Sequence, residues 1–330
     1  MNDFKDIVGH DDIKAQLTNA VASQQVSHAY IFSGDNGSGK KTMAKAFAKM
    51  LLCEEGGTSP CNKCKSCMQI DSDNNPDLKI INGQKVILTK DEIRQQVVND
   101  ALIKPYAGKK KVYIIPNAHL LRIDAQNVLL KTIEEPPEYA VIILVADNED
   151  AILPTIMSRC VKLRFKALGE EVIKKYLMEN CGMVDYAAAA SAAFCGGSLG
   201  RAIRYSTTED FATMKQRVVK IMSSLDEREL YDIMDEIMVM VADKDNLEDY
   251  LDLMLLWFRD VLMLKVTNDP NKLLYKDEYN SIKAQTRVRG YDEIEVIIKA
   301  IDTTRTRLKA HVNMDTALEL LVLTMKNPIV

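Results

Sequence analysis

The chain has 330 residues, of which 47% are hydrophobic and 27% are charged, and its formal net charge is −4 at pH 7. These values are typical of ordinary globular domains, and the length is sufficient for two or three of them. They argue against an independent nucleic-acid binder with a broad basic face, because Lys and Arg number 26 against 24 Asp and Glu up to residue 205, and 17 against 23 beyond it.

The sequence contains no membrane or export signal that we recognise. The most apolar segment, 251–266, is interrupted by Arg259, Asp260 and Lys265, so no apolar run reaches the roughly 20 residues of a membrane span. The start of the chain is acidic and polar, unlike a secretory signal. We therefore expect a cytoplasmic protein.

The first 166 residues alternate strand-like and helical patterns. Three runs are nearly all apolar, as in strands buried on both faces of a parallel sheet: 29–32, 112–115 and 140–146. Apolar residues at helical spacing follow over 42–52, and 124–134 is a predicted helix that Pro136 and Pro137 end. This alternation predicts a three-layer α/β domain.

A glycine-rich loop stands between the first strand and the helix that follows it. The loop consists of Gly34, Asp35, Asn36, Gly37, Ser38, Gly39 and Lys40. In this context backbone N–H groups, a lysine and a helix N-terminus point at phosphate oxygens. The sequence therefore predicts a P-loop NTPase type of domain.

Two further positions indicate that this loop has lost its chemistry. A working loop follows its lysine with Ser or Thr, whose hydroxyl binds Mg²⁺, but here Lys41 follows and Thr42 comes one residue too late. After the strand at 112–115, Pro116 and Asn117 stand where an acidic pair would assist the metal and orient water. We predict that the chain does not hydrolyse ATP and holds Mg²⁺·ATP poorly.

Four of the seven cysteines form a cluster with metal-ligand spacing: Cys53, Cys61, Cys64 and Cys67. Gaps of two residues let neighbouring thiolates converge on one tetrahedral ion, and four sulfurs suit structural Zn²⁺. Gly56, Gly57 and Pro60 supply the loop that returns to Cys53. The alternatives are reduced structural thiols or an iron–sulfur cluster.

No strand pattern is evident beyond residue 166. Helical periodicity covers a short unit at 170–179, 186–194 and 199–205, which Gly196 and Gly197 interrupt, and then longer segments including 230–241 and 250–266. The layout predicted is an α/β domain, a small helical domain and a larger helical domain.

Three parts of the chain resemble bacterial clamp-loader subunits of the AAA+ superfamily, over about residues 4–203. They are the run from Ile7-Val8-Gly9-His10 through His28-Ala29-Tyr30 and the glycine-rich loop, the segment DAQNVLLKTIEEPP at 124–137, and IMSRC at 156–160. The resemblance implies an AAA+ domain over 1–166 with a zinc module at about 53–67. It further implies a small helical lid domain over 167–207 and a C-terminal helical collar domain for oligomerisation over 208–330.

The resemblance also implies roles for two arginines. In that family the arginine of Ser-Arg-Cys reaches across a subunit interface to a γ-phosphate, which makes Arg159 an arginine finger that acts in trans. The family's other sensor is an arginine three residues after a glycine, but here Gly200 takes that place and Arg201 is displaced. One residue rotates a helix position by about 100°, so we expect Arg201 to miss the phosphate loop.

As a member of that family, the chain is expected to be a non-hydrolysing stator within a heteropentamer. Its partners would be gamma/tau and delta subunits, and the sliding clamp and primer-template DNA through the assembly. The alternatives are an ATP-hydrolysing gamma/tau motor and a zinc-dependent nucleic-acid-binding module. A name built on the polymerase III holoenzyme would attach DNA polymerase (nucleotidyltransferase) activity to the chain, but no nucleotidyl-transfer site is visible in the sequence.

Basic residues offer weaker candidates for DNA contact. The resemblance places Arg122 and Lys131 on or near a helix that faces the threaded DNA, which makes them candidate phosphate contacts; ordinary helix surface is the alternative. The run 109–111, three lysines, is expected to be a solvated loop.

Overall fold

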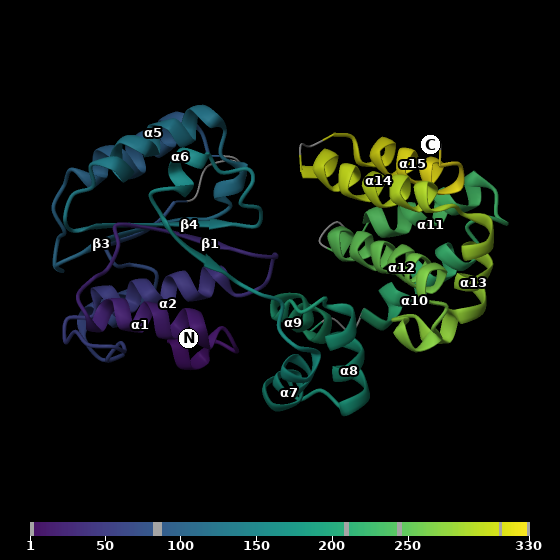
Figure 1. Ribbon diagram of the computed structural model, residues 1–330, viewed down its shortest axis with the longest axis horizontal. Coiled ribbons are helices and arrows are strands. Elements are labelled where there is room, and N and C mark those ends of the chain that lie inside the picture. The colour runs from purple at the N-terminus through teal and green to yellow at the C-terminus, as the bar shows by residue number, and fades with distance from the viewer. Residues whose placement is uncertain (1–2, 82–87, 208–210, 243–245, 310–311, 329–330) are drawn as a thin grey trace. The chain divides into compact units, whose positions relative to one another are not determined.

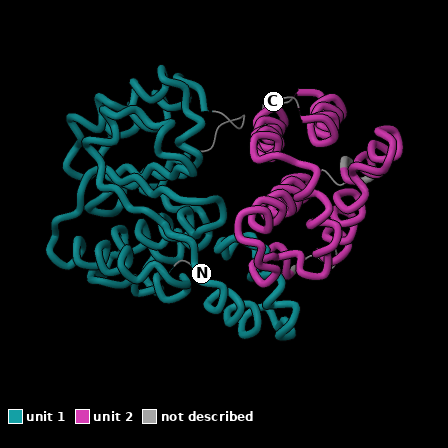
Figure 2. Tube along the Cα trace, turned by 45° about the vertical axis from the view of Figure 1, so that its right-hand side comes forward, with its two compact units in different colours: residues 1–203 teal, residues 204–330 magenta. Residues whose placement is uncertain are grey.

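The structure is a computed structural model that describes residues 3–81, 88–207, 211–242, 246–309 and 312–328. The chain divides into two compact units, residues 1–203 and 204–330, which Figure 2 shows in different colours. The three-domain division expected from the sequence stays a prediction. Among the described helices, none combines the length and hydropathy needed to cross a membrane.

Unit 1 is built on a five-stranded parallel sheet with the strand order β2-β3-β4-β1-β5. The strands are β1 Ala29–Ser33, β2 Leu78–Ile80, β3 Lys111–Ile115, β4 Ala140–Ala146 and β5 Val161–Arg164. The β1 strand lies between β4 and β5, so the loop that follows it begins inside the sheet. The α/β class with a parallel sheet is confirmed.

Helices cover both faces of this sheet. In Figure 1, α1 Asp11–Ala22 and α2 Lys40–Leu52 lie on one face, and α5 Ile123–Glu134 and α6 Pro154–Met157 lie on the other. The other helices that begin in unit 1 are α3 Lys65–Asp71, α4 Lys90–Ile93 with a π-helical continuation over Arg94–Asn99, α7 Glu170–Cys181, α8 Asp185–Phe194 and α9 Leu199–Thr207.

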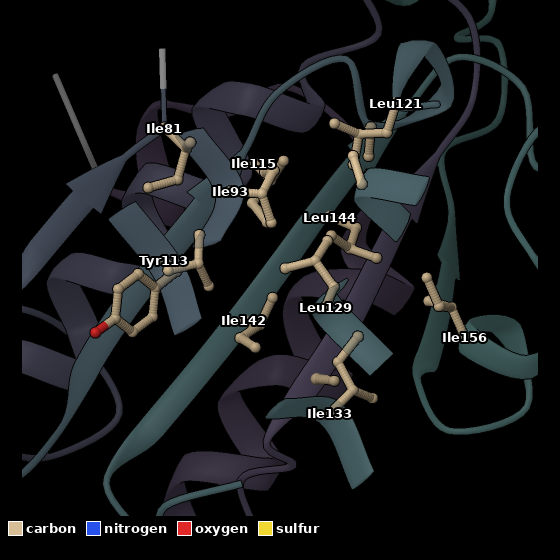
Figure 3. Close-up of a cluster of buried hydrophobic side chains, with 14 of the residues drawn as sticks. Ile81, Ile93, Tyr113, Ile115, Leu121, Leu129, Ile133, Ile142, Leu144 and Ile156 are labelled. Atoms are coloured by element: carbon tan, nitrogen blue, oxygen red, sulfur yellow. The ribbon is translucent and has the colours of Figure 1, made fainter. Parts of the chain in front are cut away.

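Successive residues of the buried strands supply two separate cores, one on each side of the sheet. Ile31 packs with Leu129 of α5 in the first core, part of which Figure 3 shows, whereas Phe32 packs with Phe47 of α2 in the second. All four side chains are fully buried. Full burial of such a side chain contributes about 1.5–3 kcal/mol, so these two cores hold the strand ends in place.

The sequence analysis missed β2 and β5 because they are edge strands. They are short and carry charged side chains, Lys79 in β2 and Lys162 and Arg164 in β5. Charged residues at sheet edges keep such strands from pairing with other chains, and they also remove the apolar run by which a buried strand is recognised.

The expectation of a solvated run at 109–111 is wrong for its last lysine. Lys111 opens β3, is only 4% exposed, and its Nζ lies 2.7 Å from a carboxylate oxygen of Asp100. Lys110 is half-buried and donates to the Glu138 carbonyl oxygen at 2.8 Å. Of the three lysines, only Lys109 is exposed, which leaves little charge here for a DNA backbone.

The described part of unit 2 is helical, as predicted. Its helices are α10 Phe211–Ser223, α11 Leu230–Ala242, α12 Leu247–Thr267, α13 Tyr279–Val288, α14 Tyr291–Lys309 and α15 Met314–Lys326. The helix α12 forms the centre of this unit: Trp257 and Phe258 are fully buried, and the indole of Trp257 donates to Gln285 at 2.9 Å. A helix that is apolar nearly all round is buried on several sides, as its composition indicates.

Candidate functional site

The glycine-rich loop connects β1 to α2 at the carboxyl end of the sheet. Gly37 and Gly39 have φ angles of +77° and +92°, a region that side-chain-bearing residues rarely adopt, so the loop requires glycine at both positions. A hydrogen bond from Nε2 of His10 to the Ser38 carbonyl oxygen, at 3.0 Å, holds the loop in place. Burial lowers the pKa of His10, so the ring is a neutral donor to this carbonyl oxygen.

The loop borders a cavity of about 370 Å³. Its apolar wall comes from Ile7, Val8, Val145, Leu168, Leu199 and Ile203, and its polar wall includes the loop and Lys40, Lys41 and Thr42. An anion-binding loop facing an apolar pocket is the layout of a nucleotide site. The structure places Gly37, Gly39 and Lys40 in the wall of this cavity, and the role of these residues and Gly34 as a phosphate loop stays a prediction.

The ammonium group of Lys40, the lysine of the loop, is bound by groups of the same chain. The ammonium of Lys40 lies 3.0 Å from an Asp147 carboxylate oxygen and donates to the carbonyl oxygens of Gly34 and Asp35 at 2.5 and 2.6 Å. Its side chain is 5% exposed. An ammonium has three protons, so these acceptors occupy the group that would otherwise meet phosphate.

Asp147 is the site residue that the sequence analysis missed. It directly follows β4, which lies next to β1, so the carboxyl ends of the two strands bring Asp147 beside the loop. Its backbone N–H donates to Nδ1 of His119 at 3.1 Å, which fixes the turn. The available signal was its place after the run 140–146, since neighbouring parallel strands end at the same edge.

A magnesium–nucleotide complex does not fit the side chains at this cavity. Pro116 and Asn117 line the cavity at the positions where an active site would have its acidic pair. Lys41, the residue before Thr42, is exposed. The carboxylates among the described residues of the lining are Asp6 and Asp147, and the second is paired with Lys40. Mg²⁺ needs an octahedral set of oxygen ligands, whereas the residue after Lys40 is Lys41, which supplies an ammonium in place of a hydroxyl.

The first turn of α9 packs directly on the crest of the phosphate loop. Gly200 donates its N–H to the Gly37 carbonyl oxygen at 2.9 Å, and the Ser198 hydroxyl donates to the Asn36 carbonyl oxygen at 2.8 Å. A Cβ on Gly200 would lie 2.8 Å from the Gly37 Cα, so glycine is needed for this approach. Within the described residues, those that line the cavity from α9 are Leu199, Gly200 and Ile203 and not Arg201, in agreement with the expected displacement.

Three of the four clustered cysteines come from the adjoining ends of α2 and α3, and Cys61 comes from the loop 54–63 between these helices. Cys53 caps the end of α2, Cys64 caps the start of α3, and Cys67 lies in the first turn of α3. The four Sγ atoms all lie within 4.8 Å of one another, and those of Cys61 and Cys67 are 4.0 Å apart. Tetrahedral coordination at Zn–S distances of 2.3 Å places sulfurs about 3.8 Å apart, so the cluster fits one such ion.

The surroundings of these sulfurs suit thiolates. The backbone N–H groups of Lys63 and Cys64 point at the Cys61 sulfur at 3.5 and 3.3 Å and lower the pKa of its thiol to about 7. Burial raises the pKa of the Cys67 thiol, which a bound cation would offset. Four protein sulfurs leave no open coordination position, so such a site would be structural.

Arg159 lies two residues after the end of α6. The guanidinium donates from Nη1 to the Thr155 carbonyl oxygen at 3.0 Å, and its Nη2 lies 3.1 Å from an oxygen of Glu134. The side chain is 41% exposed. Burial raises the pKa of the neighbouring Cys160 thiol to about 12, so this thiol carries no charge that would compete for the arginine.

The two candidate DNA contacts, Arg122 and Lys131, are both exposed. Arg122 is the N-cap of α5 and Lys131 lies in the last turn of the same helix. Their exposure agrees with a phosphate contact and equally with ordinary helix surface.

Comparison with known proteins assigns the family. A family model described as DNA polymerase III, delta subunit, matches residues 9–169. The DNA polymerase III subunit delta' of Bacillus subtilis (strain 168) is 32% identical over 314 residues, which cover 94% of this chain and 94% of the relative. The chain belongs to the family of DNA polymerase III delta' subunits.

Related proteins differ in how much of their own length is matched. The tau/gamma subunit of Haemophilus influenzae is 36% identical over 222 residues, which are 66% of this delta' family chain but 32% of the relative. A solved gamma subunit-related protein from Thermotoga maritima aligns over 96% of this chain and 98% of its own, with 15% identity and a TM-score of 0.43. The delta' relative is thus matched along nearly its whole length, whereas the tau/gamma relative is matched along a third of it.

Proposed function

We propose that this delta' family chain is the non-hydrolysing stator of the DNA polymerase III clamp loader, which helps to load the sliding clamp onto primed DNA in replication. The observation that carries the proposal is the Lys40–Asp147 ion pair at a phosphate loop where Lys41, Pro116 and Asn117 occupy the positions expected to assist magnesium. The chain has the AAA+-type fold of a nucleotide-driven subunit. However, the carboxylate of Asp147 pairs with Lys40, the lysine that would otherwise bind a phosphate.

In this proposal the chemistry that remains is carried out for a neighbour. Arg159 is exposed at the end of α6, so its guanidinium is accessible to a γ-phosphate bound in an adjacent gamma/tau subunit. A guanidinium that stabilises the charge developing on a transferred phosphoryl group increases turnover by roughly 10³ or more. Arg159 is therefore proposed as an arginine finger in trans, and the chain has no independent catalytic activity.

The remaining assignments follow from the same family. Residues 1–166, 167–207 and 208–330 are proposed as AAA+, lid and collar domains. The four sulfurs within 4.8 Å of one another support structural zinc at 53–67. The partners proposed are gamma/tau and delta subunits in a heteropentamer, with the clamp and DNA reached through the assembly in the cytoplasm. Arg122 and Lys131 remain candidate phosphate contacts.

The decisive experiment compares the chain alone with the assembled loader. We expect no magnesium-dependent phosphate release from the purified chain. In the assembly, Arg159→Ala should abolish the share of ATP turnover that depends on this subunit, without changing the unfolding midpoint of the isolated chain. Turnover near ~1 s⁻¹ by the chain alone would favour a motor subunit, and unchanged turnover of the Arg159→Ala assembly would remove the finger.

A further inference from the structure

The carboxylate beside Arg159 has no role in the function proposed so far. Glu134 is the last residue of α5 and belongs to the segment 124–137. The family resemblance assigned no role to the glutamates of this segment. Its Oε1 lies 3.1 Å from Nη2 of Arg159, and the side chains are 46% and 41% exposed respectively. Both partners are therefore accessible to a molecule that docks on this end of the unit.

The ion pair joins two helix ends that are fixed by the core. Ile133, next to Glu134, and Ile156, in the turn before Arg159, are each 1% exposed and belong to the same hydrophobic cluster. Figure 3 shows both isoleucines beside the sheet, Ile133 on α5 and Ile156 on α6. The carboxylate thus approaches the guanidinium from a rigid backbone, and the distance between the two groups is set by the fold.

The contacts of Arg159 turn it toward its own chain. Nη1 donates to the Thr155 carbonyl oxygen at 3.0 Å and lies 3.3 Å from the Ser158 hydroxyl, while Nη2 faces Glu134. To meet a phosphate of a neighbour, Nη2 has to exchange the carboxylate for a phosphate oxygen. The carboxylate and the phosphate are both anions that match the guanidinium fork, so they compete for one donor group.

We infer that Glu134 is a holding residue for the finger: it keeps Arg159 folded against α5 and α6 until a triphosphate on the adjacent subunit displaces it. This inference rests on the proposed role of Arg159 in trans. As a consequence, the adjacent subunit binds ATP less tightly, because the Glu134–Arg159 ion pair has to break before Arg159 can contact the phosphate. An exposed ion pair is worth little, so the penalty is roughly twofold to fivefold in apparent ATP affinity.

The chain offers a matched control one residue away. Glu135 is an exposed glutamate directly after α5, and no ion pair of its side chain is present among the described residues. Glu134→Gln and Glu135→Gln remove the same charge from the same surface, but the first alone frees Arg159. A general electrostatic effect of the acidic pair would appear in both variants.

The experiment measures ATP turnover of the assembled loader as a function of ATP concentration. The turnover of the loader that carries Arg159→Ala is subtracted, so that only the part that depends on Arg159 is compared. Glu134→Gln should lower the half-saturating ATP concentration roughly twofold to fivefold without lowering maximal turnover, and Glu135→Gln should change neither. The difference between Glu134→Gln and wild type should shrink in high salt, which screens exposed ion pairs. Unfolding midpoints of the isolated variants check that each has folded.

Two results overturn the inference. If Glu134→Gln behaves like Glu135→Gln, the ion pair does not hold the finger. If Glu134→Gln lowers maximal turnover at unchanged half-saturation, the carboxylate orients the arginine for reaction instead of restraining it. Both results differ from a failure of the proposed function. In that case Arg159→Ala itself would leave the ATP turnover of the assembly unchanged.

Discussion

Replacing Asp147 by Asn tests whether the phosphate loop is occupied by the chain's own carboxylate. The substitution keeps the shape and the backbone N–H that bonds to His119, but it leaves the ammonium of Lys40 without a counter-ion in a site where that side chain is 5% exposed. Lys40 retains the carbonyl oxygens of Gly34 and Asp35.

The expected loss of stability follows from this geometry. Removing one partner of a fully buried ion pair costs about 3–5 kcal/mol. Asp147 is 34% exposed and Lys40 keeps two acceptors, so we expect about 1–3 kcal/mol. For a unit of this size, each 1 kcal/mol lowers the melting temperature by about 2–4 °C. The variant should melt measurably below wild type in a circular-dichroism scan.

A phosphate-bearing anion should restore what the substitution removes. Inorganic pyrophosphate without magnesium can act as the missing counter-ion, so it should raise the melting temperature of Asp147→Asn and leave wild type nearly unchanged. A ligand at tenfold its dissociation constant adds about 1.4 kcal/mol. Asp150→Asn is the control, because Asp150 is an exposed aspartate of the same turn and makes no ion pair within the described structure.

The reasoning is refuted if Asp147→Asn melts like Asp150→Asn, or if pyrophosphate stabilises wild type as much as the variant. The first result would mean that the Lys40–Asp147 contact contributes nothing to stability. The second would mean that Asp147 leaves the loop freely and that the phosphate position is open.

Two further outcomes are expected. The purified chain should contain about one zinc ion, which metal analysis can count, and Cys64→Ser should lose the metal and melt at lower temperature; a stable metal-free chain would contradict the zinc assignment. Glu149 accepts two bonds from Arg164 at 2.8 Å, and these bonds, more than any other contact, lower the pKa of its carboxyl below 4.5. The stability that Arg164→Ala removes should therefore be present above about pH 4.5 and disappear as the pH falls through the lowered pKa; a difference that persists at pH 2 would show that it does not come from this carboxylate.

The sequence was most informative where a residue type has a single use. Glycines at fixed spacing after an apolar run predicted a loop that the structure places beside a cavity. The residues after Lys40 and after β3 predict that this loop has lost its metal chemistry, which stays a prediction. Paired cysteines two residues apart predicted a cluster that the fold brings within 4.8 Å. In each case the pattern lies within one short stretch of the chain, so it could be recognised without knowledge of the fold.

Contacts between distant segments were beyond the sequence. Asp147 reaches Lys40 because β4 pairs with β1, and Arg159 meets Glu134 because α5 and α6 share one core. Lys111 looked solvated as one of three lysines, yet Asp100 draws it into the interior. Charged residues whose partners lie far along the chain give no local pattern, so only the folded structure distinguishes a surface charge from a buried ion pair.

The contact between α9 and the phosphate loop has a mechanical consequence. In proteins that close around a ligand, the hinge angle depends on whether the ligand is bound. Here the N–H of Gly200 and the hydroxyl of Ser198 bond the start of α9 directly to the loop. If the chain is the stator proposed above, this joint should keep one angle while adjacent subunits go through an ATP cycle, and it would give those moving subunits a stationary surface.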